Sequence, residues 1–241
     1  MALLRRALKD SSFPRKRESS GVQTNDAGSR LIYVNKRGRR AWFCGAVLAL
    51  CALVFAASPA VAATETLSGK PLLAALKAGG LVLYFRHTST DFSQNDDQMT
   101  GYEDCAKQRN LTDAGCGEAR AIGAAIKRLG VPMGNVLASP FCRTMETAQL
   151  IFDRAVATPA ARGGPASVPA ERYAGLRRLL ASAPPSGTNT AIVSHGNPFR
   201  ALTGEAYLAE GEVAVIQPLG NDQFRILARI PQDGWDALAA P

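Results

Sequence analysis

Histidine is almost absent from this sequence: His87 and His195 are the only two among 241 residues. Two imidazoles without a paired cysteine or carboxylate motif make a poor zinc site, so we expect neither a metal nor another cofactor. Internal repeats are also missing, which speaks against a repeat architecture. The most apolar run, residues 45–57, is shorter than the roughly 20 residues that a membrane-spanning helix needs.

Residues 1–62 have the composition of a targeting segment. The first forty are polar and basic, and the apolar run that follows ends in the small residues Ala60, Val61 and Ala62. This order is typical of a secretory signal peptide. We therefore expect export to the periplasm and no stable membrane insertion after cleavage; the alternative is an uncleaved N-terminal anchor. The leader is long before about residue 36, so translation could start downstream of Met1.

The net charge of +8 belongs to this leader. Residues 1–62 hold 11 Lys and Arg against 3 Asp and Glu, which leaves 17 of the 28 basic and 17 of the 20 acidic side chains for residues 63–241. The predicted mature part, a single domain over residues 63–241, is therefore electrically balanced. A balanced charge does not indicate the basic surface that nucleic-acid binding needs, so we expect no DNA or RNA partner.

The sequence contains five cysteines, of which Cys44 and Cys51 would leave with the signal peptide. Cys105, Cys116 and Cys142 remain, in a compartment where disulfides persist. We expect Cys105 to pair with Cys142, because both sit beside motif residues. Three buried free thiols are the alternative.

Strand-like and helix-like patterns alternate from residue 68 onward. Continuous apolar runs are typical of strands buried on both faces, and amphipathic stretches between them predict helices. The predicted strands are 81–85, 135–139 and 189–195, with a hairpin over 213–230; the predicted helices are 68–80, 112–130, 141–152 and 173–185. For the third helix, Ser139 is the expected cap and Pro140 the first residue. We expect a three-layer α/β/α sandwich with a mostly parallel central sheet.

Both histidines follow an apolar strand. LVLYF leads to Arg86 and His87, TAIVS leads to His195, and Arg143 lies in the first turn of the helix after the middle strand. Ligands of open α/β sheets bind beyond the carboxyl ends of the strands, and a helix N-terminus favours anions. We therefore expect these four residues to converge on one phosphate pocket.

This residue set suits phosphoryl transfer. Guanidinium forks match phosphate oxygens and stay charged at physiological pH. A neutral imidazole can attack phosphorus and form a phosphohistidine, which splits one difficult displacement into two. The other groups neutralise the transferring phosphoryl, so the predicted chemistry needs no metal. A single histidine at a sheet edge is commonly just a satisfied polar residue, whereas the set of four favours catalysis.

Three segments, FRHTST, SPFCRTMETA and IVSHGNPF, occur in an order that resembles the histidine phosphatase superfamily, which includes phosphoglycerate mutases and acid phosphatases. NLTDAGCGEARAIG also resembles the Leu-Thr-x-x-Gly segment of that family. The resemblance spans roughly residues 81–196 and implies a phosphoglycerate mutase-like fold. It also implies that His87 is the phospho-accepting nucleophile and that Arg86, Arg143 and His195 complete the phosphate pocket.

The sequence departs from that family at two points. Thr88 follows the first histidine, where relatives often have glycine. In addition, no position clearly matches the carboxylic acid that commonly protonates the leaving oxygen. Asp91, Glu171 and Glu212 are the candidates, and each could equally be an ordinary solvated carboxylate. Good leaving groups react without such an acid.

The predicted function is hydrolysis of phosphomonoesters on a small-molecule or glycolipid substrate outside the cytoplasm. Residues 154–188 are the only stretch between Arg143 and His195 with room for a lid, so we expect an exposed, shallow site. Export favours a sugar phosphate or an envelope glycolipid, by location and analogy. The alternatives are a catalytically silent phosphate-binding module and a mutase or phosphotransferase of the same fold.

Overall fold

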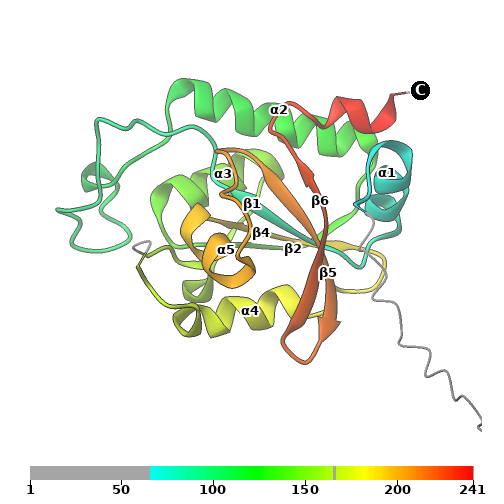
Figure 1. Ribbon diagram of the computed structural model, residues 1–241. Coiled ribbons are helices and arrows are strands. Elements are labelled where there is room, and N and C mark those ends of the chain that lie inside the picture. The colour runs from blue at the N-terminus through cyan, green and yellow to red at the C-terminus, as the bar shows by residue number, and fades with distance from the viewer. Residues whose placement is uncertain (1–65, 165–166, 241) are drawn as a thin grey trace, which may run out of the picture. The chain divides into compact units, whose positions relative to one another are not determined.

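A six-stranded mixed sheet forms the centre of the molecule (Figure 1). The computed structural model describes residues 66–164 and 167–240, which pack as one unit. The predicted leader, residues 1–62, and its cleavage point lie outside the described residues. Within the two described ranges, no helix combines the length and the apolar character needed to cross a bilayer.

The strand order of the sheet is β3-β2-β4-β1-β5-β6. Three of the five neighbouring pairs are parallel, namely β2 with β3, β2 with β4, and β1 with β4, while β5 pairs antiparallel with both of its neighbours. The predicted, mostly parallel sheet is confirmed. The strands are β1 (Val82–Arg86), β2 (Met133–Ala138), β3 (Val156–Ala157), β4 (Asn189–Ser194), β5 (Val213–Gly220) and β6 (Gln223–Ile230).

Helices cover both faces of this sheet, as a three-layer sandwich requires (Figure 1). One face packs against α1, α2 and α3, and the other against α4 and α5. The helices are α1 (Gly69–Ala78), α2 (Asp113–Leu129), α3 (Cys142–Phe152), α4 (Ala174–Ala181) and α5 (Gly196–Thr203). Four of them were predicted; α5 was not, because a sequence of eight residues beginning Gly-Asn-Pro resembles a turn.

The apolar residues of β1 are divided between the two layers. Leu83 and Phe85 belong to the core with α1, α2 and α3, whereas Val82 and Tyr84 belong to the core with α4 and α5. All four are fully buried, because successive side chains of a strand point to opposite faces. Each such residue contributes roughly 1.5–3 kcal/mol through its burial. The strand that ends in Arg86 is thus held firmly from both sides.

The ends of α2 follow the sequence signals. The Thr112 hydroxyl accepts a hydrogen bond from the Gly115 N–H at 3.0 Å, and Gly130 ends the helix in the left-handed conformation. The start of α3 differs from the prediction. The helix begins at Cys142, and the Ser139 side chain caps nothing, because its hydroxyl lies 2.8 Å from Nε2 of His195.

The sheet brings the ends of three strands together. In the parallel pair β1–β4, Arg86 is in register with Ser194, and the His87 N–H donates to the Ser194 carbonyl at 3.1 Å. His87 and His195, which follow these two residues directly, must therefore emerge side by side. On the other side of β4, the Ser139 N–H donates to the Val193 carbonyl, so the end of β2 joins the same edge.

A long segment without regular periodicity connects β1 to α2 and projects beyond the sheet (Figure 1). We call residues 91–108 the β1–α2 segment. The side chain of Gln108, which is buried, joins it to α3: its oxygen accepts from the Cys142 N–H at 3.0 Å, and its NH₂ donates to the Tyr102 carbonyl at 2.9 Å. This segment therefore stands next to the helix that carries Arg143.

Candidate active site

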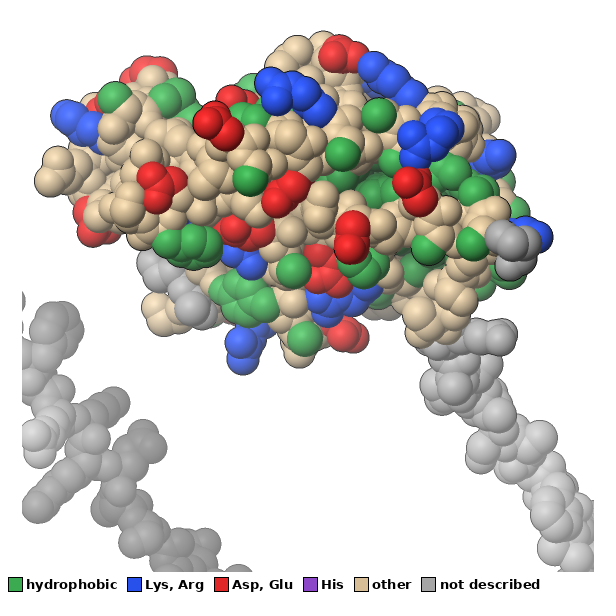
Figure 2. All heavy atoms as spheres, turned by 90° about the horizontal axis from the view of Figure 1, so that it is seen from above, with side chains coloured by type: hydrophobic (Ala, Val, Ile, Leu, Met, Phe, Trp, Pro, Cys, Tyr) green, Lys and Arg blue, Asp and Glu red, His purple; other side chains and the backbone are tan. Residues whose placement is uncertain are grey.

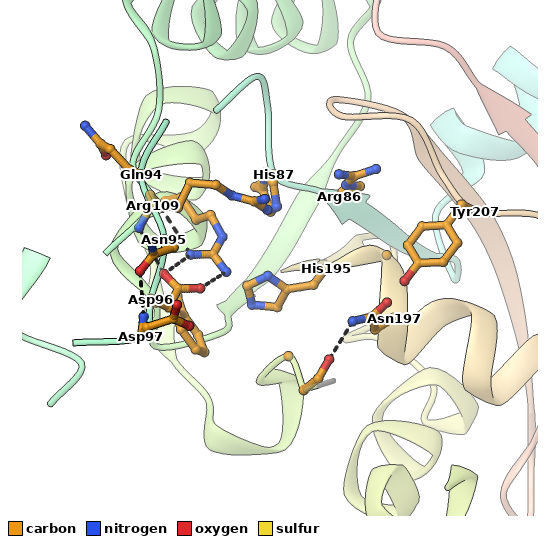
Figure 3. A pocket seen from close by; sticks show the side chains of 15 residues that line it. Arg86, His87, Gln94, Asn95, Asp96, Asp97, Arg109, His195, Asn197 and Tyr207 are labelled. Atoms are coloured by element: carbon orange, nitrogen blue, oxygen red, sulfur yellow. Dashed lines mark hydrogen bonds and ion pairs between the residues drawn. The ribbon is translucent and has the colours of Figure 1, made fainter. Parts of the chain in front are cut away.

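A cavity of about 590 Å³ opens at this edge of the sheet, beyond the carboxyl ends of β1 and β4 (Figure 3). It contains all four predicted site residues, Arg86, His87, Arg143 and His195. The residues after β1 and β4, the first turns of α3 and α5, and the β1–α2 segment form its walls. The expected spatial convergence is therefore present.

The two imidazoles lie against each other. The ring centroids of His87 and His195 are 5.6 Å apart, and the ring planes are inclined by 68°. Both side chains are almost completely buried, with 1% and 6% of their surface exposed. Figure 3 shows both rings turned toward the same hollow. A group the size of a phosphoryl could contact both of them.

A backbone carbonyl fixes the tautomer of His87. Its Nδ1 lies 2.9 Å from the Thr88 carbonyl oxygen, which can only accept, so the proton is on Nδ1 and the lone pair is on Nε2. Burial lowers the pKa of His87 to about 3, against the opposing effect of this hydrogen bond; the charge of Arg143 acts in the same direction as burial. The side chain is therefore a neutral nucleophile with its reactive nitrogen free.

His195 is also held neutral and in one orientation. Burial, followed by the positive charge of Arg143, keeps its pKa well below the ordinary value. Its Nε2 hydrogen-bonds with the Ser139 hydroxyl at 2.8 Å, and the Tyr84 hydroxyl donates to its backbone carbonyl at 2.7 Å. Two strands and a core tyrosine thus position this ring, as expected for a preorganised site.

Arg86 is anchored on the far side of the histidines. Its guanidinium donates to the Leu208 carbonyl at 2.8 Å and to the Glu210 carboxylate at 3.2 Å. Glu210 also accepts from the N–H and the hydroxyl of Thr90, and it lies 3.8 Å from Nδ1 of His87. Glu210 was not predicted, because it comes from a loop 124 residues away in the sequence.

Arg143 occupies the first turn of α3, as predicted, and is 5% exposed. Both terminal nitrogens of its guanidinium bind the carboxylate of Asp96, at 2.9 and 3.0 Å. One of them also donates to the Arg109 carbonyl at 3.2 Å. The partner of the predicted phosphate-binding arginine is thus a carboxylate from the β1–α2 segment.

A third arginine, Arg109, lines the cavity, and the sequence alone gave no reason to select it. Its guanidinium carbon lies 4.9 Å from the centre of the Phe92 ring. In the described residues, the Nε atoms of Arg86, Arg109 and Arg143 are buried and have no hydrogen-bond partner. Three cationic groups with unused donors around two neutral imidazoles make a strong oxyanion environment.

The three predicted candidates for the leaving-group acid lie elsewhere. Asp91 is half-buried and accepts from the N–H and the hydroxyl of Ser93, a local turn. Glu212 pairs with Arg229 at 2.6 Å, and Glu171 is exposed in a short 3₁₀ turn. None of the three lines the cavity, so none is placed to act on a substrate bound there. The carboxylates that do line it are Asp96 and Asp97.

The walls of the cavity also differ from the prediction. Of residues 154–188, Gly163 and Gly164 reach the cavity, and the opposite wall is made by residues 94–97 of the β1–α2 segment. The sequence prediction considered only the stretch between Arg143 and His195 and did not include residues 94–97. The β1–α2 segment has no hydrophobic periodicity, so the sequence did not indicate that this segment folds back over the strand ends.

A disulfide joins Cys105 to Cys142, with their Cα atoms 5.7 Å apart, which confirms the predicted pairing. Cys116 is the free cysteine among the described residues. The disulfide attaches the β1–α2 segment to the first residue of α3, next to Arg143. Within residues 66–164 and 167–240, no group of three or more His, Cys, Asp or Glu side chains is arranged to hold a metal ion.

The three-layer fold, with two neutral imidazoles and three arginines at the strand ends, defines an α/β protein suited to binding a phosphate group. Residues 82–162 match the family model described as the histidine phosphatase superfamily (branch 1). This is the superfamily that the motifs of the sequence resemble, and the match covers about a third of the chain. The match includes Arg86, His87 and Arg143, and the family supports phosphatase activity. No curated protein matches the chain.

Several solved structures are similar to this chain at low sequence identity. The protein histidine phosphatase SixA in complex with tungstate is 19% identical, with a TM-score of 0.45, 63% of this chain covered and 97% of that one. A mycobacterial glucosyl-3-phosphoglycerate phosphatase is 15% identical, with a TM-score of 0.45 and coverages of 61% and 96%. A phosphoserine phosphatase mutant from Entamoeba histolytica, bound to phosphoserine, is 11% identical, with a TM-score of 0.44 and coverages of 64% and 98%. The substrates in these names belong to those proteins.

Proposed function

We propose that this protein hydrolyses phosphomonoesters through a phosphohistidine on His87. The observation that carries the proposal is the pairing of β1 with β4, which sets the rings of His87 and His195 5.6 Å apart in a cavity with three arginines. The hydrogen bond from Nδ1 to the Thr88 carbonyl leaves Nε2 of His87 free to attack.

In the first step, Nε2 of His87 attacks phosphorus as the bond to the ester oxygen breaks, which yields a phosphohistidine and an alcohol once that oxygen gains a proton. In the second step, water attacks phosphorus, the N–P bond breaks, and the water gives up a proton. Arg86, Arg109 and Arg143 hold the three equatorial oxygens together with His195. Positioning and charge neutralisation are what such a transfer requires.

The proposed reaction needs no metal. The guanidinium groups around the cavity carry three permanent positive charges, which match the charge that a divalent ion and a lysine provide at other phosphoryl-transfer sites. The histidines are kept neutral by burial, so they are nucleophile and hydrogen-bonding partner rather than additional cations.

The proposed substrate is a sugar phosphate or a phosphorylated envelope glycolipid, met outside the cytoplasm. The leader predicted over residues 1–62 supports export, and the Cys105–Cys142 disulfide suits an oxidising compartment. Nucleic acid is a poor candidate, because the charges of residues 63–241 balance and basic and acidic side chains are interspersed on the face shown in Figure 2.

The test is turnover of p-nitrophenyl phosphate by the protein without residues 1–62, with and without EDTA, beside a His87→Ala variant. The expected result is chelator-resistant turnover that the substitution abolishes. Turnover lost with EDTA would indicate a metal enzyme, and no turnover of any phosphoester would indicate a phosphate-binding module. Acid-labile, base-stable phosphate trapped on His87 during turnover identifies the nucleophile.

A screen of phosphorylated metabolites against phosphorylated envelope sugars and glycolipids tests the substrate class. The proposal expects the highest kcat/KM among the sugar phosphates or glycolipids. A cytoplasmic metabolite preferred by orders of magnitude would contradict the proposed location, while leaving the phosphatase chemistry intact.

A further inference from the structure

The ion pair between Arg143 and Asp96 occupies the groups that a phosphate would use. The two terminal nitrogens of Arg143 bind the two oxygens of Asp96 at 2.9 and 3.0 Å, the bidentate geometry that guanidinium also forms with phosphate. A substrate phosphate that takes this fork must therefore displace the carboxylate. The backbone N–H of Arg109 donates to Asp96 at 2.9 Å and would keep the residue nearby.

The exposed fractions of the Arg143 and Asp96 side chains indicate the direction in which the carboxylate would be displaced. The Arg143 side chain is 6% exposed and the Asp96 side chain 32%, so the carboxylate lies between the buried guanidinium and solvent. Figure 3 shows Asp96 facing the hollow into which His87 and His195 turn. An in-line attack by buried His87 sends the leaving oxygen away from the ring, toward the mouth of the cavity. That is the side on which Asp96 stands.

We propose that Asp96 is the acid that protonates the leaving oxygen, released from Arg143 by the incoming phosphate. This inference rests on the proposed phosphatase function. As the Nε2–P bond forms and the P–O ester bond breaks, the Asp96 carboxyl gives its proton to the ester oxygen, and the alcohol leaves. When water then attacks phosphorus and the N–P bond breaks, the carboxylate takes the proton from that water and is restored.

Exchange of partners lets the Asp96 carboxylate take up a proton from solvent before the ester bond breaks. While Arg143 holds the carboxylate, two charge-assisted bonds occupy both of its oxygens. Once phosphate takes the guanidinium, the carboxylate loses this cation and faces the negative oxygens of the substrate. Loss of a cation and approach of an anion both favour protonation of a carboxylate. The protonated acid is thus formed where and when the substrate is bound.

The other carboxylates near the site are less suitable. Glu210 has Arg86 and two groups of Thr90 as partners, and it does not line the cavity. Asp97 lines the cavity but makes no ion pair among the described residues, so phosphate binding would release nothing from it. The candidates selected from the sequence lie outside the cavity.

The experiment compares Asp96→Asn with the unchanged protein on a series of phosphomonoesters, from p-nitrophenyl phosphate through phenyl phosphate to alkyl phosphates. The need for an acid grows as the leaving alcohol becomes more basic, and general acid catalysis contributes about 10²–10⁴-fold. We expect kcat/KM to fall by about 10²-fold or more on alkyl phosphates and by less than about tenfold on p-nitrophenyl phosphate. The plot of log kcat/KM against the basicity of the leaving group should become steeper.

Asp91→Asn is the matched control, because it makes the same change in an aspartate of the same segment that does not line the cavity. It should keep the slope of the unchanged protein. A second readout uses inorganic phosphate as the probe: removal of the competing carboxylate in Asp96→Ala should lower the inhibition constant of phosphate. Urea unfolding of each variant shows that it is folded.

Three outcomes would overturn the inference. An equal loss on all substrates, with weaker phosphate inhibition, would mean that Asp96 only holds Arg143 in place. A faster rate on all substrates would mean that it only obstructs the site. A steeper slope in Asp97→Asn and not in Asp96→Asn would move the acid to the next residue. Turnover that survives His87→Ala would instead contradict the proposed function.

Discussion

Thr88 follows the proposed nucleophile, at a position where relatives often have glycine. The structure accommodates it, because Thr88 is not among the residues with positive φ and its side chain is buried beside Thr147. What His87 requires from this position is the backbone carbonyl, which accepts from Nδ1. Any residue supplies a carbonyl. The departure from the family pattern therefore leaves the tautomer of His87 unchanged.

Arg143→Ala should be among the most damaging single changes to activity. It removes a buried cation that faces the transferring group, and deletion of one preorganised oxyanion donor costs about 3 kcal/mol, a factor of roughly 100 in rate. The measurement is kcat/KM on p-nitrophenyl phosphate. Arg120→Ala, an exposed arginine of α2, is the control and should be close to neutral. A near-normal rate in Arg143→Ala would mean that this guanidinium has no part in the transition state.

Most site residues that the sequence predicted lie at strand ends, whereas those that it did not predict lie in a connecting segment. Arg86, His87 and His195 each end a strand whose apolar run is visible in the sequence, and parallel pairing then determines that the ends meet. Asp96 lies in the β1–α2 segment and Arg109 follows it directly. This part of the chain has no hydrophobic periodicity of a helix or a strand. Their positions depend on hydrogen bonds and a disulfide that only tertiary structure reveals.

At the scale of elements, the crossing of α2 over the chain after β1 positions the nucleophile. Ser89, two residues after His87, accepts through its carbonyl from the Thr112 N–H at 3.0 Å. An added Cβ at Gly115 would lie 2.1 Å from that same carbonyl oxygen. The glycine of the Leu-Thr-x-x-Gly segment is thus needed for close approach of helix and backbone.

Two glycines of α2 make a matched test of this contact. Gly115→Ala should lower the free energy of unfolding, by about 1–3 kcal/mol as for other overpacked sites, because backbone must move. Gly117→Ala, two residues on, meets nothing within 4 Å and should stabilise the helix by about 0.5–1 kcal/mol. Urea unfolding measures both. Equal effects of the two substitutions would show that the crossing imposes no constraint.

Element boundaries were less predictable than element types. The helix after β2 was expected from its capping residues at Ser139 and Pro140, but it starts at Cys142. The Ser139 hydroxyl hydrogen-bonds with Nε2 of His195 at 2.8 Å, and the Ser139 carbonyl accepts from the Thr144 hydroxyl at 2.8 Å. A residue suited to capping was used at the site instead. Sequence signals for caps do not distinguish these two roles.

At the scale of the whole molecule, burial and the nearby positive charges both act against protonation of the two site histidines. Two imidazoles are almost fully buried beside three arginines, so their protonation is unfavourable in the folded protein. An unfolded chain has no such restriction, and its histidines titrate near pH 6.5. The arrangement that keeps His87 nucleophilic therefore makes the folded state sensitive to acid.

The pH dependence of unfolding tests this at the scale of the whole domain. The pKa of His87 is lowered by burial from 6.5 to about 3, so at this residue the unfolded chain binds more protons than the folded one between these values. Burial also holds the pKa of His195 well below its ordinary value, which acts in the same direction. The free energy of unfolding should fall as pH decreases below 6.5, by up to about 1.4 kcal/mol per pH unit for each histidine.

A His87→Gln/His195→Gln variant, neutral at these positions at every pH, should show a shallower fall in urea titrations between pH 7 and pH 4. Carboxylates titrate in both proteins, so the difference isolates the imidazoles. Parallel curves for the two proteins would mean that the two histidines bind as many protons in the folded protein as in the unfolded chain at each pH, so that burial does not hold them neutral.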